Sequence, residues 1–510
     1  MDSGPRIVDG VSLASCTKSV VGRTLDLMTS TDSMANETTR NAGIRDVVVV
    51  GGGLAGLSAA CALAGSGYYV HLIERRPYVG GRASSYEHPG TGEVVDNCQH
   101  VLLGCCTNLI AFYKQLSVAD QIRWFNRITF IEPGGRRSLL RPGLLPAPLH
   151  NAIAFLQSSA LSPADKVAIS RGMMSFLRGI PADGGDNFAS WLARHGQTRR
   201  AIDRFWNPVL VSALNEHLDC VSVHYAAMVF RRSFMQSEQA GWMGVPTIPL
   251  SELYSHAVDF IESHGGQVSL RTSVDSFHYD EQNRRWRIGF EGGSVEADAV
   301  VLAVPFESMQ KLYPLLPALG HGTSESMVER LGQFQHSPIT GIHLWFDREI
   351  TDLDHAVLLE TTIQWMYNKT RLQPQRRAED VGSYLELVVS ASKTLVPMSR
   401  QEIIDLALRE LGEFFPVVRQ AKLVKAAVVK EVRATFSVTP GLDAYRPGPE
   451  TAWPRIFLAG DWTATGWPST MEGAVRSGNL AAEALTKAAG KSQKFLQPDL
   501  PPQGLMRLFR

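Results

Sequence analysis

Residues 46–74 alternate apolar runs with glycines in the order of a strand, a tight turn, a helix and a second strand. VVVV at 47–50 predicts a buried strand, GGGLAG at 51–56 a glycine turn, and YYVHLIE at 68–74 the next strand. The uncharged interval 47–70 is long enough for a transmembrane helix, but its six glycines favour tight turns. We therefore predict a βαβ unit.

The rest of the chain divides into regions of different periodicity. Residues 162–215 are dominated by helical periodicity, and 273–305 alternate like the strands of a meander. Residues 306–430 mix strand candidates with one long helix, and 455–462 and 471–490 predict a last strand and helix. No internal repeat or coiled coil is present in this order of elements.

Gly51, Gly53 and Gly56 form a G-x-G-x-x-G motif between the first strand and the helix. The first glycine permits the turn, the second lets the backbone approach a pyrophosphate, and the third lets helix and strand pack closely. Glu74 ends the next strand, 23 residues after Gly51, where a carboxylate accepts hydrogen bonds from a ribose diol. The pattern predicts a dinucleotide site.

Two further segments extend this site. Residues 80–82 add a glycine pair and an arginine, and Asp461 follows the last strand, where it can bind ribityl or ribose hydroxyls. A helix opens near Met471, and its N-terminus can stabilise negative charge on a reduced flavin. A cofactor held from both ends of the chain in this way is typical of FAD.

Together these motifs resemble the FAD-dependent amine oxidase and carotenoid desaturase superfamily. Within it, the chain is most similar to the squalene-associated FAD-dependent desaturases, the hydroxysqualene dehydroxylases of squalene and hopanoid biosynthesis. The similarity rests on GEVVDNCQHVLLG (92–104), RFWNPVLVSALN (204–215), GWMGVPTIPLSELY (241–254) and GDWTATGWPSTMEGAVRSG (460–478). Cys98 and Cys106 depart from the pattern, since a glycine and an aromatic residue are usual there.

The resemblance implies an α/β fold in which a Rossmann-type FAD-binding domain, GR2 or amine-oxidase-like, carries a discontinuously inserted mixed α+β substrate domain. It also places Val274 against the adenine. The predicted domains are a disordered N-terminal extension (1–43, with Met34 as an alternative start), the FAD-binding domain (44–105, 225–305 and 431–490), the substrate domain (106–224 and 306–430) and a C-terminal tail (491–510). The predicted FAD-binding residues are Gly51, Gly53, Leu54, Ala55, Gly56, Glu74, Arg75, Arg76, Gly80, Gly81, Arg82, Val274, Gly460, Asp461, Met471, Glu472, Gly473 and Ala474.

The reaction that the resemblance implies is reduction of hydroxysqualene to squalene, with loss of water and oxidation of the flavin. It requires an acid for the leaving hydroxyl, a dry apolar tunnel and a docked flavin. We single out Asp96, His100 and Glu472 as candidate acids. Asp96 and His100 can equally be structural hydrogen-bond partners, and Glu472 can equally cap the last helix.

The tunnel and the surroundings of the substrate are predicted from apolar segments. Phe205, Trp206 and Trp467 are the predicted substrate contacts, although each can also be ordinary core. Because hydroxysqualene and squalene dissolve in bilayers, we expect residues 139–156 and 504–510 to lie at a membrane interface. We therefore predict a cytoplasmic protein, peripheral at the inner face of the cytoplasmic membrane, with an unidentified electron donor.

Composition narrows the compartment and the partners. The 510 residues contain 50 Lys+Arg and 50 Asp+Glu, and the arginine pairs are scattered, which argues against nucleic acid. Six cysteines in so long a chain do not form a disulfide framework, and no secretory signal is present. These features favour a reducing cytoplasm.

The segment VVDNCQHVLLGCC raises the alternative of a metal site. Cys98 and His100 are one residue apart, and the adjacent Cys105 and Cys106 cannot readily reach one ion. No second ligand cluster such as H-E-x-x-H occurs, so we predict no metal. The cysteines are then small apolar residues beside a polar loop that faces the flavin.

The FAD motifs are compatible with two further classes of function. A carotenoid or phytoene-type desaturase, or an amine oxidase, would use the same FAD motifs in the oxidative direction. A non-enzymatic protein like the GDP-dissociation inhibitors would bind prenylated partners, but such proteins generally lack a working flavin site. The intact glycine motif and Glu74 argue against that class.

Overall fold

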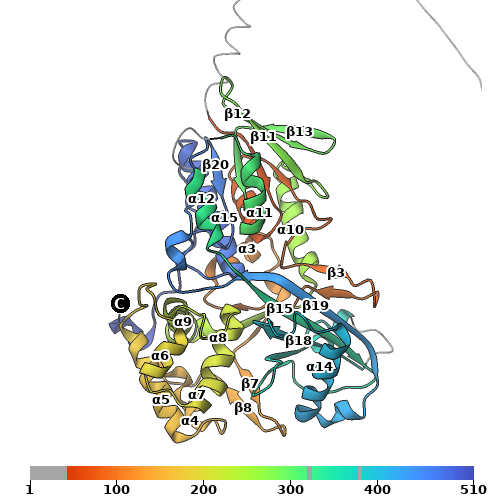
Figure 1. The fold of residues 1–510 in the computed structure, drawn as a ribbon, viewed down its shortest axis with the longest axis vertical. Helices are drawn as coiled ribbons and strands as arrows, with labels where there is room; N and C mark the ends of the chain where they lie inside the picture. The colour runs from red at the N-terminus through yellow and green to blue at the C-terminus, as the bar shows by residue number, and fades with distance from the viewer. Residues whose placement is uncertain (1–42, 319–323, 377–381, 510) are drawn as a thin grey trace, which may run out of the picture. The chain divides into compact units, whose positions relative to one another are not determined.

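The apolar run that begins at Asp46 forms β1 (Asp46–Val50), the central strand of a five-stranded parallel sheet (Figure 1). The computed structural model describes residues 43–318, 324–376 and 382–509. Both faces of the parallel sheet are covered, which explains why the sequence of β1 is continuously apolar. The strand order is β10 (Gln267–Ser269), β2 (Tyr69–Ile73), β1, β14 (Ala299–Leu302), β20 (Ile456–Leu458).

Helices cover one face of this sheet and a small antiparallel sheet lies on the other side. On the helical face, α2 packs along α15, and α3 packs against α15 in turn. The helices are α2 (Leu54–Ala64), α3 (Thr107–Gln115), α10 (Leu250–Ser263) and α15 (Met471–Ala488). The antiparallel strands are β11 (Val274–Asp280), β12 (Arg285–Phe290) and β13 (Gly293–Ala297).

The uncharged interval 47–70 therefore forms β1, α2 and the start of β2, as the βαβ prediction required. Within the described parts of the chain, no helix has the length and apolarity needed to cross a membrane.

A seven-stranded sheet forms the second large layer, with α14 (Arg400–Phe414) packed against β15 and β19 (Figure 1). Its strands are antiparallel except for the parallel pair β16 and β7. The order is β19 (Leu423–Phe436), β15 (His336–Phe346), β18 (Ser383–Ser390), β17 (Trp365–Asn368), β16 (His355–Leu358), β7 (Ile128–Ile131), β8 (Arg137–Leu140).

Two small sheets and several helices complete the described structure. The two-stranded sheet pairs β3 (Ser85–Glu87) with β4 (Val94–Asp96), and the three-stranded sheet has the order β5 (Leu102–Leu103), β9 (Met243–Pro246), β6 (Ile122–Phe125). The remaining helices are α4 (Ala152–Gln157), α5 (Pro163–Ser175), α6 (Phe188–Arg194), α7 (Arg199–Ala201), α8 (Asn207–Leu214), α9 (Val223–Val229), α11 (Phe306–Leu312), α12 (Ser324–Gly332) and α13 (Lys369–Leu372), with π-helical turns η4 (Ile202–Trp206) and η5 (Phe230–Met235).

The packing moves several segments across the predicted domain boundaries. Helix α3, which we assigned to the substrate domain, buries Leu109 and Phe112 in the same apolar cluster as α2. Turn η5, which we assigned to the FAD-binding domain, instead stacks Phe230 on Phe176 of the helical region, with 6.3 Å between ring centroids. Residues 44–510 form one compact unit, because apolar side chains of both regions share their cores. The predicted extension 1–42 and Met34 lie outside the described residues.

A close backbone approach at Gly56 fixes α2 on the sheet. A Cβ atom at Gly56 would lie 1.9 Å from the carbonyl oxygen of Gly51, whereas one at Gly53 would meet no atom nearer than 4.0 Å. We expect Gly56→Ala to lower the free energy of unfolding by about 1–3 kcal/mol, because the helix must move off the turn. Urea unfolding checks this, with Gly53→Ala as the control that keeps wild-type stability. Equal stability of the two variants would contradict the packing argument.

Candidate active site

The glycine turn after β1 places the N-terminus of α2 at the wall of a cavity. Gly51 has φ +110°, and a Cβ atom there would lie 2.5 Å from the carbonyl oxygen of Ala303, so no other residue fits. Gly53 is the N-cap residue of α2, and the space in front of it is open. The backbone N–H groups at the helix start are therefore accessible to a phosphate.

Glu74 braces the glycine turn from the end of β2. Its carboxylate accepts one hydrogen bond from the Gly52 N–H at 2.6 Å and another from the Arg76 N–H at 2.8 Å. Each oxygen keeps a second lone pair, so the buried carboxylate can still accept a hydrogen bond from a sugar hydroxyl.

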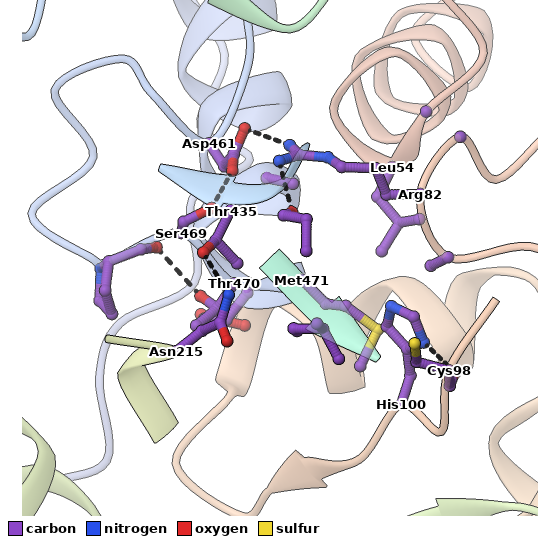
Figure 2. Close-up of a pocket in the computed structure, with 18 of the residues that line it drawn as sticks. Leu54, Arg82, Cys98, His100, Asn215, Thr435, Asp461, Ser469, Thr470 and Met471 are labelled. Atoms are coloured by element: carbon purple, nitrogen blue, oxygen red, sulfur yellow. Dashed lines mark hydrogen bonds and ion pairs between the residues drawn. The ribbon is translucent and has the colours of Figure 1, made fainter. Parts of the chain in front are cut away.

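The C-terminal block reaches the same place through an ion pair. Asp461, just after β20, accepts a hydrogen bond from the Arg82 guanidinium at 2.6 Å, and its other oxygen accepts one from the Ser469 hydroxyl (Figure 2). Arg82 also donates to the Ala434 carbonyl at 2.9 Å. Thr470 caps α15 by accepting from the Gly473 N–H at 3.0 Å, which leaves the helix start beside the cavity.

A cavity of about 620 Å³ joins these three segments. Gly56 and Gly473 are the predicted FAD-binding residues that do not line it, because each supports a close backbone contact instead. The predicted residues that line it are Gly51, Gly53, Leu54, Ala55, Glu74, Arg75, Arg76, Gly80, Gly81, Arg82, Val274, Gly460, Asp461, Met471, Glu472 and Ala474.

The cavity continues into an apolar arm. Its wall there comes from α8 and from strands of the seven-stranded sheet, which are distant in sequence from the glycine motif. The lining residues of the arm are Ile128, Phe130, Leu140, Pro208, Val209, Ala213, Ile339, Val357, Trp365, Tyr367 and Val388. None of them is charged, so this part of the cavity suits an apolar ligand.

Asp96 lies behind the cavity wall and does not line it. Its carboxylate forms a fully buried ion pair with Lys369, with 2.6 Å between Nζ and Oδ2, and accepts a hydrogen bond from the Ser85 hydroxyl at 2.5 Å. Burial opposes ionisation, but the charge and hydrogen bond of Lys369 outweigh it and lower the pKa of Asp96 to about 2. An ionised, paired carboxylate argues against our prediction that Asp96 protonates a substrate.

The carboxylate of Glu472 holds the start of α3. It accepts hydrogen bonds from the backbone N–H groups of Asn108 and Leu109, at 3.2 and 2.8 Å, and from the Asn108 side chain at 3.0 Å. Burial raises the pKa of Glu472 and outweighs these donors and Arg476, which lower it. The predicted capping role is therefore favoured over the acid role, but the helix that it caps is α3 and not α15.

His100 is the candidate acid that lines the cavity without such ties (Figure 2). Its Nδ1–H donates to the Cys98 carbonyl at 2.8 Å, which directs the proton away from Nε2. Burial lowers the pKa of His100, although the hydrogen bond to Cys98 opposes this. At neutral pH the ring is neutral, so Nε2 accepts a hydrogen bond rather than donating one.

Cys98 lies in a strained loop, at a position where glycine would be expected. Cys98 has φ +98°, a conformation that favours glycine, the residue usual at this position in the resembling family. Its thiol is buried and packs against Gly341 of β15. In the described parts of the chain, no three His, Cys, Asp or Glu residues are grouped as metal ligands would be.

Of the predicted substrate contacts, Trp467 lines the cavity and Phe205 and Trp206 do not. Trp206 is completely buried among aromatic rings, 4.9 Å from the Phe230 ring centroid, and its Nε1–H donates to Gln197 at 2.8 Å. The π-helical turn that carries Phe205 and Trp206 points both rings into this core, while the following turn of α8 supplies the cavity wall. Trp462 is likewise buried and donates to the Val304 carbonyl at 2.8 Å.

Sequence reasoning missed the aromatic pair Trp365 and Tyr367 and the buried Lys369. The two rings stack 5.5 Å apart at 9° on β17, and both line the apolar arm. Burial, with a smaller contribution from Glu386, raises the pKa of Tyr367 well above its usual range, so its phenol keeps its proton. The alternating residues of the segment WMYN were the available sequence signal for this strand. Their spacing from the flavin motifs does not indicate that they lie near the flavin site.

Comparison with known proteins agrees with this geometry. The family model for flavin containing amine oxidoreductase matches residues 54–486. The chain belongs to this family. It is an FAD-dependent oxidoreductase, and a model of pyridine nucleotide-disulphide oxidoreductases also matches residues 5–89.

Among curated relatives, the chain is similar to a 15-cis-phytoene desaturase of Synechococcus elongatus, with 27% identity over 88% of this chain and 97% of the relative. A probable zeta-carotene desaturase of the same organism is 26% identical over 87% and 98%. Solved structures share the fold. They include an oxidoreductase from Methanosarcina mazei (TM-score 0.67, 18% identity, 87% of this chain and 100% of that one) and putrescine oxidase bound to putrescine (TM-score 0.65, 18% identity, 87% and 99%).

The residues of this cavity fit FAD, the cofactor of the family. The open face at Gly53 would admit the pyrophosphate, and Glu74 and Asp461 present carboxylates to sugar and ribityl hydroxyls. The start of α15 would face the isoalloxazine ring with its partial positive charge. We propose these roles for the residues named.

The buried ion pair predicts a pH-dependent effect of Asp96→Asn. Because the pKa of Asp96 falls from 3.8 in the unfolded chain to about 2, the carboxylate stabilises the fold above pH 4 by roughly 2–3 kcal/mol. That stability is lost as the pH falls from about 4 to about 2. We expect the variant to be less stable than wild type by this amount at pH 7, and the difference to shrink toward pH 2.

Chemical denaturation at a series of pH values measures this difference. Asp259→Asn, at an exposed aspartate of α10, is the matched control and should leave stability unchanged. A constant difference between Asp96→Asn and wild type from pH 7 to pH 2 would contradict the assignment.

Proposed function

We propose that this enzyme reduces hydroxysqualene to squalene. The observation that carries the proposal is the uncharged arm that extends from the flavin end of the cavity to β7 and β8. A long isoprenoid chain needs a channel of this kind, in which each buried methylene group contributes about 0.8 kcal/mol. The relatives named for phytoene and zeta-carotene, both isoprenoids, support the same substrate class.

The chemistry of the arm disfavours an amine substrate. A protonated amine that is removed from water needs a carboxylate partner, and none of the residues that line the arm is acidic. The acidic residues that line the cavity lie at its flavin end or just beside that end. They are Glu74, Glu431, Asp461 and Glu472. Putrescine oxidase therefore shares the fold with this chain but supplies no model for its substrate.

The polar groups of the wall suit an isoprenoid that carries a hydroxyl. We assign Tyr367 as the hydrogen-bond donor to that hydroxyl, because it lines the arm and its phenol keeps its proton. Neutral His100 accepts a hydrogen bond from the same hydroxyl through Nε2 and orients it. When bound and reduced, FAD supplies the hydride that replaces the departing water.

The site also has to exclude bulk water from a carbon atom that becomes cationic. Apolar side chains of α8 and the seven-stranded sheet surround that region and keep competing nucleophiles away. Oxidised flavin is the second product, so an external electron donor has to reduce the enzyme again. We propose that the enzyme works in the cytoplasm, at the inner face of the cytoplasmic membrane where its substrate dissolves.

A phytoene-type desaturase is the second candidate. The curated relatives, which align over nearly their whole length, favour it. A desaturase removes hydride from a hydrocarbon, and it has no use for the phenol of Tyr367 in its channel. The two functions therefore differ in the direction of hydride transfer and in the need for a hydroxyl.

Product analysis distinguishes the two functions. Purified holoprotein, reduced chemically without oxygen and mixed with hydroxysqualene in detergent, should release squalene in a stoichiometric single turnover. The flavin absorbance should return as the product forms. Oxidised holoprotein with phytoene is the parallel reaction. Dehydrogenated phytoene, with no squalene from the first mixture, would establish the desaturase instead.

Replacing Tyr367 tests the role of its hydroxyl group. Tyr367→Phe keeps the stacking on Trp365 and removes only the hydroxyl, so we expect kcat to fall about 100-fold with KM and flavin content unchanged. Tyr445→Phe, at an exposed tyrosine, is the control and should retain wild-type turnover. Turnover of Tyr367→Phe within twofold of wild type would show that the phenol does not assist departure of the hydroxyl.

A further inference from the structure

An unusual number of large apolar side chains lie exposed on two segments that are far apart in sequence. The first segment follows β8 and includes α4, and the second is the C-terminal tail. Leu144 is fully exposed and Leu508 is 78% exposed. We call the set the apolar face: Leu144, Leu145, Leu149, Ile153, Leu156, Leu505, Leu508 and Phe509.

The two segments form one surface because they bind each other. The Leu505 N–H donates to the Ala147 carbonyl at 2.8 Å, and Met506 is buried in the same apolar core as Ala147. Arg231 then ties the end of the tail to the helical region, since it donates to the carbonyls of Leu177 and Phe509 at 2.7 and 2.6 Å. Figure 1 places the C-terminal end of the chain beside this group of helices.

The core behind the apolar face is already complete. The exposed apolar side chains therefore do not contribute to the core of this chain. Ala147 and Met506 are almost completely buried between the two segments, whereas their neighbours Leu145 and Leu505 remain exposed. Single exposed leucines are common on soluble proteins, but eight large apolar side chains on two mutually bound segments are typical of an interaction surface.

The segments that form the apolar face carry exposed arginines and no exposed acidic side chain. Arg141, Arg171, Arg178 and Arg507 are exposed on the same segments and on the adjoining α5 and its following turn. Asp165 is the only acidic residue between positions 133 and 178, and it is buried where it accepts hydrogen bonds from Ser162 and Thr198. Residues 500–510 contain no acid.

The lining of the apolar arm includes a residue of the strand that precedes this surface. Leu140 lines the arm at the end of β8, four residues before Leu144, and α4 packs against β8. The lining of the arm therefore reaches the strand after which the apolar face begins.

We propose that the apolar face docks on a bilayer that contains anionic lipid. The leucines and Phe509 enter the region of the acyl chains, and the four arginines bind the lipid headgroups. Docking connects the apolar arm to the bilayer, so that a substrate dissolved in lipid enters without crossing water. This role of the surface rests on the proposed isoprenoid substrate, but the binding itself requires no substrate.

Vesicle flotation with the full-length holoprotein tests the docking. The probes are vesicles of phosphatidylcholine alone and vesicles in which about a third of the lipid is phosphatidylglycerol, both at about 0.1 M salt. We expect the wild type to float with the anionic vesicles and at least tenfold less with the neutral ones. We expect the double variant Leu144→Glu/Leu508→Glu to lose at least tenfold of the binding to anionic vesicles.

The control variant is Val328→Glu, since Val328 is 52% exposed on α12, which Figure 1 shows far from α4. It should float like the wild type. Flavin absorbance and thermal unfolding verify that all variants remain folded, and turnover in detergent separates docking from chemistry. A double variant that is unable to bind vesicles but active in detergent supports the proposal, even if the substrate is a carotenoid precursor.

Three results would overturn the proposal. In the first, wild-type protein fails to float with anionic vesicles. In the second, the double variant floats as well as wild type. In the third, wild-type protein binds no vesicles and is a dimer that the double substitution dissociates. The last result would identify the apolar face as a contact between two copies of this chain.

Discussion

The buried ion pair between Lys369 and Asp96 joins the two halves of the active site. Lys369 follows β17 of the seven-stranded sheet, and Asp96 ends β4 beside the flavin-facing loop. Lys369 also donates to Gln99 at 2.8 Å and lies 3.3 Å from Glu386, so one ammonium group positions three polar side chains. Breaking a pair that is removed from water in this way leaves an uncompensated charge, which costs about 3–5 kcal/mol.

The same contact orders the loop that carries Cys98 and His100. Asp96 and Gln99 enclose Cys98 in the sequence, and Cys98 keeps a positive φ that a cysteine does not favour. Surrounding contacts have to hold such a residue in place, and here they come from Lys369 on one side and Gly341 on the other. The direction of the His100 ring toward the cavity thus depends on a strand almost 270 residues away.

The cavity has two ends that follow different chemical rules. The flavin end consists of backbone N–H groups, carboxylates and Arg82, which together suit a charged dinucleotide. The apolar arm consists of uncharged side chains of α8 and six strands, and one of these strands, β8, precedes a surface of leucines and arginines. In the proposed function, a cofactor with phosphates and a substrate without charge would meet at the junction, near His100 and Met471 (Figure 2).

The sequence by itself determined the flavin end, because its motif is local: Gly51, Gly53 and Gly56 follow one strand, and their turn has a single backbone solution. It also identified the two segments that form the apolar face. The tertiary structure decided what isolated side chains do. From the sequence, Asp96 and Glu472 were candidates both for acids and for structural residues, and the contacts with Lys369 and with the start of α3 show what they bind. Trp206 was a candidate both for a substrate contact and for ordinary core, and its ring lies in the core. Such roles depend on the pairing of residues far apart in the chain, which local periodicity does not encode.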